Sequence, residues 1–357
     1  MSSVAPFLIF YIGAALAGVT RGTLRQVILL SIPIVGAVNL YYLPTGAYNT
    51  FELFDYTLTL TRVDKLSVVF GWVFHLAALI GLLYALHVRD TTQHVAGILY
   101  AGSSIGALFS GDLISLFLFW EMTAITSVFL ILARRTERAQ KTAIRYLVIQ
   151  VMSGVILLAG ALIRIHETGS LAFDFIGLNS PGGWLILLAF GIKCAFPFLH
   201  NWLTDAYPEA TPTGAIFLSA FTTKLAVYTL ARGYAGTEIL VYIGATMTMF
   251  PIFYAVIEND LRRVLSYSLI NQVGFMVTGI GIGTELALNG AAAHAFAHII
   301  YKALLFMSMG AVLFRTGKIN GSELGGLYKS MPLTATFCII GAASISAFPL
   351  FSGFISK

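Results

Sequence analysis

Long apolar stretches, each about as long as a bilayer is thick, alternate with short polar segments along almost the whole chain. A helix that crosses a membrane needs about 20 predominantly apolar residues. No polar segment is long enough for a soluble domain, so we expect one continuous all-α bundle, a polytopic transmembrane helical protein. The sequence predicts spans at residues 4–20, 26–43, 66–88, 95–110, 113–133, 142–163, 183–203, 213–231, 238–257, 264–284, 287–314 and 333–355.

Composition supports this class. Hydrophobic residues make up 58% of the 357 residues and charged residues 10%, whereas a soluble domain carries about 25% charged residues. The first apolar segment has no basic flank before it and no small-residue cleavage site after it. We therefore expect a retained helix rather than a signal peptide.

The basic residues are distributed unevenly between the two sides of the predicted bundle. With the amino terminus outside, 13 of the 21 lysines and arginines fall in inner segments and four in outer ones, which follows the positive-inside rule. The run from Arg134 to Arg145 is then an anchor at the anionic cytoplasmic leaflet. Aromatic residues are not interleaved with it, so no nucleic acid is expected as a partner. The inner set is Arg21, Arg25, Arg89, Arg134, Arg135, Arg138, Lys141, Arg145, Arg262, Arg263, Arg315, Lys318 and Lys329, and the outer set is Arg62, Lys65, Arg164 and Arg232.

The outer segment 51–64 has a different pattern. Its residues 56–62, YTLTLTR, alternate with a period of two and predict a short extracellular strand or hairpin. Asp112 follows a tight turn and is placed to cap the next helix. We divide the chain into N-terminal helices with the hairpin, 1–111, and a core, 112–357.

Five ionisable residues stand inside apolar spans, which is where a charge costs about 2.5–3.5 kcal/mol on insertion scales. They are Glu121, Lys193, Lys224, Lys302 and Lys357. Such residues are hard to explain as scaffold, and we expect them to mark a path for ions.

Two of these residues lie deep in their spans. Glu121 is near the middle of 116–132. A carboxyl group buried alone is neutral and a nearby lysine keeps it ionised, which suits a proton switch. The alternative is a protonated glutamate that bonds neighbouring helices. Lys224 lies twelve residues after Pro212, which is too deep for its side chain to reach the membrane surface.

A third group lies on a single helix face. His294, His298 and Lys302 are spaced four residues apart, and this spacing lines up side chains along a helix. Histidine titrates near neutral pH, so the string can pass protons. A metal site is the alternative for two histidines at this spacing, but no third ligand lies nearby in the sequence, and no metal is expected. Either histidine by itself could simply pack against a carbonyl group.

Proline interrupts two apolar segments, at AFPFL (195–199) and AFPLF (347–351). Proline breaks or kinks a helix, and paired broken helices are typical of transporter sites. Lys193 precedes the first break and Lys357 follows the second, which favours broken helices over ordinary kinks. Cys194 and Cys338 lie in apolar helices, and neither a disulfide nor a cofactor motif is present in the sequence.

The segment AFPFLHNWLTDAYPEATPTGAIFLSAFTTK (195–224) resembles the signature of the antiporter-like subunits of respiratory complex I, Mrp-type cation/proton antiporters and membrane-bound hydrogenases. FWEMTAITSVFLIL, SYSLINQVGFM, HAFAHIIYKALLFM and AFPLFSGFISK resemble that signature in the same order, and the resemblance covers the chain from about residue 65 onward. Thr204 replaces a proline of the family pattern, and Gly214 and Phe221 also depart from it.

The resemblance implies 14 helices with two inverted five-helix repeats, each containing a broken helix. The chain ends at Lys357, inside the expected twelfth helix, so we expect a fragment of a longer protein. Carried over by motif, Glu121 is the fifth-helix glutamate, Lys193 its seventh-helix partner, Lys224 the eighth-helix lysine, His294, His298 and Lys302 the eleventh-helix relay, and Lys357 the twelfth-helix lysine.

Within the family, AFPLFSGFISK and residues 301–335 resemble the D-type subunits of Mrp antiporters more than the complex I subunits. The resemblance implies a proton-translocating subunit of a multisubunit sodium/proton antiporter in a prokaryotic inner membrane. Its partners would be other membrane subunits, protons and sodium, and it would not itself be an enzyme. One alternative is a proton-pumping, non-redox subunit of a complex I-type NADH-quinone oxidoreductase or of a hydrogenase. Another is a membrane subunit of an inorganic-carbon accumulating complex.

Overall fold

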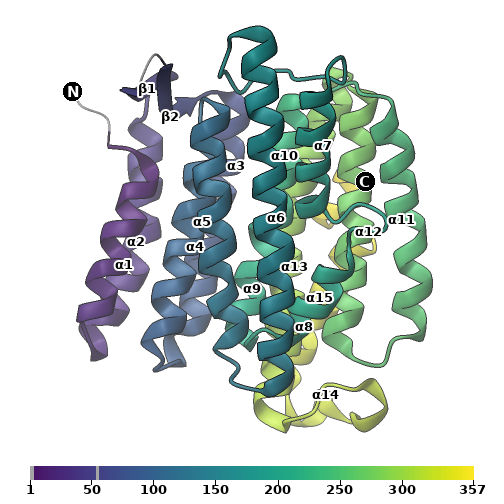
Figure 1. Ribbon diagram of the computed structural model, residues 1–357. Helices are drawn as coiled ribbons and strands as arrows, with labels where there is room; N and C mark the ends of the chain where they lie inside the picture. Colours follow the sequence, from purple (N-terminus) through teal and green to yellow (C-terminus); the bar gives the residue numbers. More distant parts are fainter. Residues whose placement is uncertain (1–3, 54–55) are drawn as a thin grey trace.

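The computed structural model describes residues 4–53 and 56–357, and Figure 1 shows a bundle of upright helices with one small hairpin. Residues 1–3 of the expected N-terminal unit and residues 54 and 55 of the expected hairpin lie outside the described part. The elements are α1 (Pro6–Val19), α2 (Gly22–Tyr42), β1 (Gly46–Leu53), β2 (Tyr56–Val63), α3 (Lys65–Tyr84), η1 (Ala85–His87), α4 (Thr91–Phe109), α5 (Leu113–Leu132), α6 (Glu137–Thr168), α7 (Pro181–Cys194), α8 (Asn201–Glu209), α9 (Pro212–Ala220), α10 (Thr222–Gly233), α11 (Ile239–Ile257), α12 (Leu261–Ile282), α13 (Glu285–Thr316), η2 (Gly321–Glu323), α14 (Leu327–Ser330), α15 (Pro332–Ile345) and α16 (Ser352–Ser356).

The predicted class, an all-α polytopic membrane protein, is confirmed. Within the described residues, eight helical segments are long and apolar enough to cross a membrane, and the pair formed by α9 and α10 counts as one of them. Helices α1, α7 and α15 are shorter apolar helices. Each predicted span coincides with a helix or with two consecutive helices, because the length of the apolar stretch sets the length of the element.

Polar side chains at the helix starts fix where several helices begin. Asp112 caps α5 as predicted, accepting a hydrogen bond from the Ser115 backbone N–H at 2.7 Å. Its other oxygen accepts from the Thr59 N–H at 2.7 Å. The alternating segment is strand β2, which pairs antiparallel with β1. One carboxylate therefore starts a helix and holds the hairpin on the bundle.

The bundle has two distinct ends (Figure 1). At the hairpin end, at the top of the view, the Gly111 N–H donates to the Thr59 carbonyl and the Ile176 N–H to the Gly233 carbonyl. At the other end, where α14 lies, Arg135 pairs with Asp90 at 3.2 Å. The residues predicted to face inward belong to segments at this second end, which we call the basic end.

Several of those residues lie in helices, and one of them, Arg262, is buried, unlike the other twelve. Arg262 lies in the first turn of α12 and is 1% exposed. Its guanidinium donates to the carbonyls of Pro208 at 2.8 Å and of Ala210 at 2.9 Å. The junction between α8 and α9 leaves carbonyls without helical partners, and arginine has enough donors to satisfy several at once.

Both proline motifs break their helices, as predicted. α7 ends at Cys194 and α8 begins at Asn201, and α15 ends at Ile345 and α16 begins at Ser352. The first and fourth residues of each motif have left-handed backbones: φ is 64° at Ala195 and 68° at Phe198, and 57° at Ala347 and 75° at Leu350. The chain thus makes the same turn twice, in segments far apart in the sequence.

A third irregularity, which we did not predict, separates α9 from α10 at Phe221. The expected span 213–231 contains no proline at this point. Side chains from other helices satisfy the backbone groups at the interruption. Tyr207 Oη donates to the Leu218 carbonyl at 2.7 Å, and the Thr222 N–H donates to Tyr100 Oη at 3.0 Å.

Candidate functional site

Glu121 projects from α5 onto the bare backbone of α6. A Cβ atom at Gly154 would overlap the Glu121 carboxylate, so only glycine permits this close approach. Glu121 Oε1 is buried and has no hydrogen-bond partner among the described residues. A buried acceptor without a donor is costly unless water or a proton supplies one.

Lys193 lies near the end of α7 and is buried. Its Nζ donates to the Trp120 carbonyl at 2.7 Å and to Thr123 Oγ1 at 2.6 Å, and it lies 4.2 Å from the centre of a Trp120 ring. Both acceptors are on α5, on either side of Glu121 in the sequence. No ion pair joins Glu121 and Lys193 in the part of the chain that the structure describes. The expected partners lie close together, and their direct pairing stays a prediction.

Lys224 lies just beyond the irregularity at Phe221 and is buried. Its Nζ donates to the Ser219 carbonyl at 2.7 Å and to Thr223 Oγ1 at 3.2 Å. The ammonium group therefore occupies the interrupted turn of the helix, which is how a lysine can be accommodated twelve residues into an apolar span.

Lys302 and the two histidines share one face of α13. Lys302 Nζ donates to Ser268 Oγ on α12 at 3.0 Å. The rings of His294 and His298 are 6.1 Å apart, and His294 Nδ1 is hydrogen-bonded to Ser356 Oγ at 2.9 Å. His298 is buried, and neither of its ring nitrogens has a partner among the described residues.

Lys357 bridges the second helix break. Its Nζ donates to the Ile345 carbonyl, the last residue of α15, at 2.7 Å, and lies 5.2 Å from the centre of the Phe275 ring. In the first break a tryptophan has a similar role, since Trp202 Nε1 donates to the Ile192 carbonyl at 2.8 Å.

The four lysines lie on elements that pack side by side. α10 contacts both α7 and α13, and α13 contacts α16. Every acceptor described above for these lysines is a carbonyl or hydroxyl oxygen, and none is a carboxylate. An ammonium group has three N–H donors, and each of these lysines uses one or two on protein. The remaining donors have no hydrogen-bond acceptor among the described residues.

Residues 4–53 and 56–357 contain no group of three or more His, Cys, Asp or Glu side chains that could hold a metal ion. His294 and His298 are therefore not joined by a third such ligand within the described residues. The role of this helix face in carrying protons stays a prediction.

Sequence reasoning missed the uncharged members of the site. Gln150 on α6 is buried, and both polar atoms of its amide lack partners among the described residues. It lies four residues before Gly154, and Tyr146, four residues earlier still, is hydrogen-bonded to Ser127 Oγ at 2.8 Å. The four-residue spacing of Tyr146, Gln150 and Gly154 was the available signal, because such residues share a helix face.

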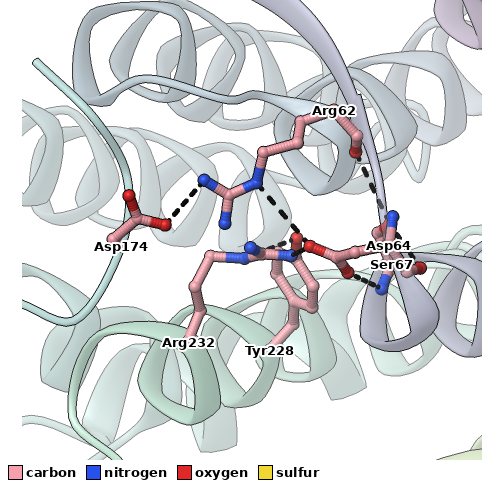
Figure 2. Close-up of polar contacts among 6 residues, drawn as sticks. All are labelled: Arg62, Asp64, Ser67, Asp174, Tyr228 and Arg232. Atoms are coloured by element: carbon pink, nitrogen blue, oxygen red, sulfur yellow. Dashed lines mark hydrogen bonds and ion pairs between the residues drawn. The ribbon is translucent and has the colours of Figure 1, made fainter. Parts of the chain in front are cut away.

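An ion-pair network holds α10 at the hairpin end (Figure 2). Arg232, at the end of α10, pairs with Asp64 at 2.6 Å, and Arg62 pairs with Asp174 at 2.8 Å and with Asp64 at 3.6 Å. Asp64 also caps α3 through the Ser67 N–H. The network ties α10, and with it Lys224, to the hairpin, to α3 and to the loop after α6.

Two solved structures share this fold over 99% of the chain, each at 22% sequence identity. The Mrp complex from Dietzia sp. aligns with a TM-score of 0.82 over 68% of its matched chain. The membrane-bound sulfane sulfur reductase, an archaeal respiratory membrane complex, aligns with a TM-score of 0.87 over 79% of its matched chain. At this level of identity the likeness establishes the fold.

Sequence relatives come from more than one kind of complex. The chain is 33% identical over 316 residues to the A/B subunit of a probable K(+)/H(+) antiporter of Rhizobium meliloti, covering 81% of this chain and 32% of that protein. It is 33% identical over 272 residues to the D-type subunit of the Na(+)/H(+) antiporter of Alkalihalophilus pseudofirmus, covering 71% of this chain and 55% of that protein. It is 32% identical over 326 residues to the N-type subunit of the NADH-quinone oxidoreductase of Desulforudis audaxviator, covering 83% of this chain and 64% of that protein.

The chain thus spans between 32% and 64% of the length of these relatives. Residues 110–357 match the family described as "NADH:quinone oxidoreductase/Mrp antiporter, TM". That match covers more than half of the chain and includes all seven predicted site residues. The chain therefore belongs to the NADH:quinone oxidoreductase/Mrp antiporter transmembrane family, as its motifs indicated.

Proposed function

We propose that this chain is a proton-translocating subunit of a multisubunit sodium/proton antiporter. Protons pass along Glu121, Lys193, Lys224, the His294–His298–Lys302 face and Lys357. The observation that carries the proposal is the set of four lysines on adjoining elements, each bonded to carbonyl or hydroxyl oxygens and each retaining unused N–H donors.

Electrostatic repulsion couples the protonation of neighbouring lysines. Two like charges about 7 Å apart repel by about 2.4 kcal/mol at an effective dielectric constant of 20. This is more than a tenfold change in a proton equilibrium, so the arrival of a proton on one lysine favours its loss from the next. At Lys224 and Lys357, irregular turns supply backbone carbonyls that hold the ammonium group without neutralising it.

A proton-pumping subunit of a complex I-type assembly is the second candidate. Its support is the 32% identity to the N-type subunit of an NADH-quinone oxidoreductase, close to the 33% identity to the D-type subunit of a Na(+)/H(+) antiporter. In that case the same relay would be driven by electron transfer in partner proteins. Sodium-dependent proton flux in the absence of a quinone and a reductant separates the two candidates.

The proposal includes an arrangement in the membrane. The hairpin end and the amino terminus face outward and the basic end faces the cytoplasm of a prokaryote, in accord with the positive-inside rule. Partner membrane proteins complete the assembly. We also propose the division into 1–111 and 112–357, and the start of the family match at residue 110 supports it.

The test is a double-mutant cycle in membrane vesicles that carry the assembled complex. Glu121→Gln and Lys193→Ala should each abolish cation-dependent proton flux while the complex still assembles on a native gel. The double variant should be no worse than either single variant, because residues acting as one unit are non-additive. Glu137→Gln, at an exposed carboxylate that pairs with Lys141, is the control. Wild-type flux in Glu121→Gln would refute the relay, and multiplicative losses would show that the two residues act independently.

A further inference from the structure

The basic end contains a cavity of about 720 Å³ between the start of α2 and the connection from α3 to α4. Three arginines and two histidines line it: Arg21, Arg25, Arg89, His87 and His94. No carboxylate is among its lining residues in the described part of the chain. A cavity of this size with cationic walls has the chemistry of an anion site.

Two of the three arginines that line the cavity have no polar partner among the described residues. Arg25 is committed to the Thr20 carbonyl, to which its Nε donates at 2.8 Å. Arg21 and Arg89 are exposed, and neither makes an ion pair or side-chain hydrogen bond with the described residues. The nearest acidic residue in the sequence, Asp90, caps α4 and pairs with Arg135. No ion pair within the described residues therefore neutralises Arg21 or Arg89.

A buried histidine forms part of the cavity wall. His94 is 3% exposed, lines the cavity, and uses its Nε2 on the Val88 carbonyl at 2.8 Å. When Nε2–H donates to that carbonyl, Nδ1 of a neutral ring is an acceptor, so the arginines are the groups that would bind an anion.

The start of α2 also favours an anion in the cavity. The 21-residue helix begins at Gly22 in the wall of the cavity, and its cap residue Arg21 makes no side-chain capping bond within the described chain. The first turn of this helix contains no acidic residue. Uncapped N–H groups at a helix start favour an anion.

The surface beyond the cavity is apolar. Farther along α2, an apolar groove between α2 and α3 is lined by Pro33, Ala37, Tyr41, Trp72 and Leu76. A ligand seated with its anionic group in the cavity could thus lay hydrocarbon chains against the same helix. Soluble phosphate would use the cavity and leave that surface bare.

We propose that this cavity binds the phosphate headgroup of an anionic phospholipid, with the acyl chains along α2. Guanidinium groups bind phosphate oxygens in pairs, and a basic pocket at the ends of transmembrane helices is suited to such headgroups. This site is separate from the proposed proton path, and its occupancy can be measured without measuring transport.

The experiment compares lipid binding by the purified full chain and by two charge-matched double variants. Arg21→Gln/Arg89→Gln removes the two uncommitted arginines of the cavity. Arg315→Gln/Lys329→Gln removes the same charge at the same end from residues that do not line the cavity. Phosphatidylglycerol is titrated into each protein in phosphatidylcholine nanodiscs, and bound lipid is counted by native mass spectrometry.

We expect the cavity variant to bind phosphatidylglycerol about tenfold or more weakly, and the control variant to stay within about twofold of the wild type. Thermal unfolding in pure phosphatidylcholine should be equal in all three proteins, which shows that folding is intact. Equal weakening in both variants would overturn the proposal in favour of general surface charge. Displacement of the lipid by millimolar inorganic phosphate would assign the cavity to a soluble anion and overturn the lipid as occupant.

Discussion

At the scale of single residues, several ionisable groups of the site lack hydrogen-bond partners in the described part of the chain. Glu121 Oε1 and both nitrogens of His298 are buried without partners among the described residues, and the lysines keep unused donors. Fully satisfied groups would hold their protons fixed, and groups with open positions can exchange them through water. The missing partners are therefore consistent with the proposed transport role.

The contact between Glu121 and Gly154 gives the first prediction. Gly154→Ala places a methyl group where the carboxylate now lies. The carboxylate is the end of a flexible side chain and can rotate away, so we expect little loss of stability. A displacement of about 1 Å at a functional group can slow a reaction about 100-fold, so proton flux should fall steeply.

Gly290→Ala is the matched control, because a methyl group there meets no atom within 4 Å. Its flux should equal that of the wild type. Flux and stability are measured on the same membrane preparations, and unchanged flux in Gly154→Ala would show that the position of this carboxylate is unimportant.

The identities of the charged residues could be predicted from the sequence, because a charge in an apolar span is conspicuous. Their partners could not. Lys302 bonds Ser268 and His294 bonds Ser356, at separations of 34 and 62 residues. Serines are common in membrane helices, and only the packing of α13 on α12 and α16 shows which of them matter.

At the scale of elements, proline determined which breaks were predictable. Both proline motifs were recognised because proline cannot donate a backbone hydrogen bond. The interruption at Phe221 had no such marker, and it persists because Tyr207 and Tyr100 satisfy the Leu218 carbonyl and the Thr222 N–H from distant parts of the chain. A break of this kind is a property of tertiary packing.

The second prediction tests that account. Tyr207→Phe removes the donor to the Leu218 carbonyl in a fully buried setting. An unsatisfied buried acceptor costs about 1–3 kcal/mol, so the thermal midpoint of the purified protein should fall. Tyr242→Phe removes a hydroxyl that bonds Glu238 on an exposed surface and should change stability by less than about 0.5 kcal/mol. Equal midpoints for the two variants would mean that the break does not need Tyr207.

At the scale of the whole molecule, the chain is a bundle with chemically different ends. Loops between helices that are distant in the sequence meet at each end, so the hairpin, the α4–α5 turn and the loop after α6 form one surface. The uneven distribution of basic residues was visible in the sequence. The burial of Arg262 was not, because a basic residue beside an apolar span is compatible with either a loop or a helix start.

The third prediction concerns orientation. Glu137 and Glu167 are exposed residues near opposite ends of α6, about 45 Å apart at 1.5 Å per residue. In a protein lacking Cys194 and Cys338, Glu137→Cys should react with a membrane-impermeant maleimide only from the cytoplasm and Glu167→Cys only from outside. The opposite labelling pattern would reverse the proposed orientation.

The lysines that rest on carbonyl oxygens at interrupted turns have a spectroscopic consequence. The carbonyl of Ser219 accepts from Lys224, and that of Ile345 accepts from Lys357. A carbonyl bonded to an ammonium group has a lower stretching frequency than one bonded to a neutral amine, because the charged donor polarises it more strongly. Isotope-edited infrared bands from these two carbonyls would therefore report the protonation of two different lysines separately. The backbone itself provides two optical probes of the proposed path, without any change to a side chain.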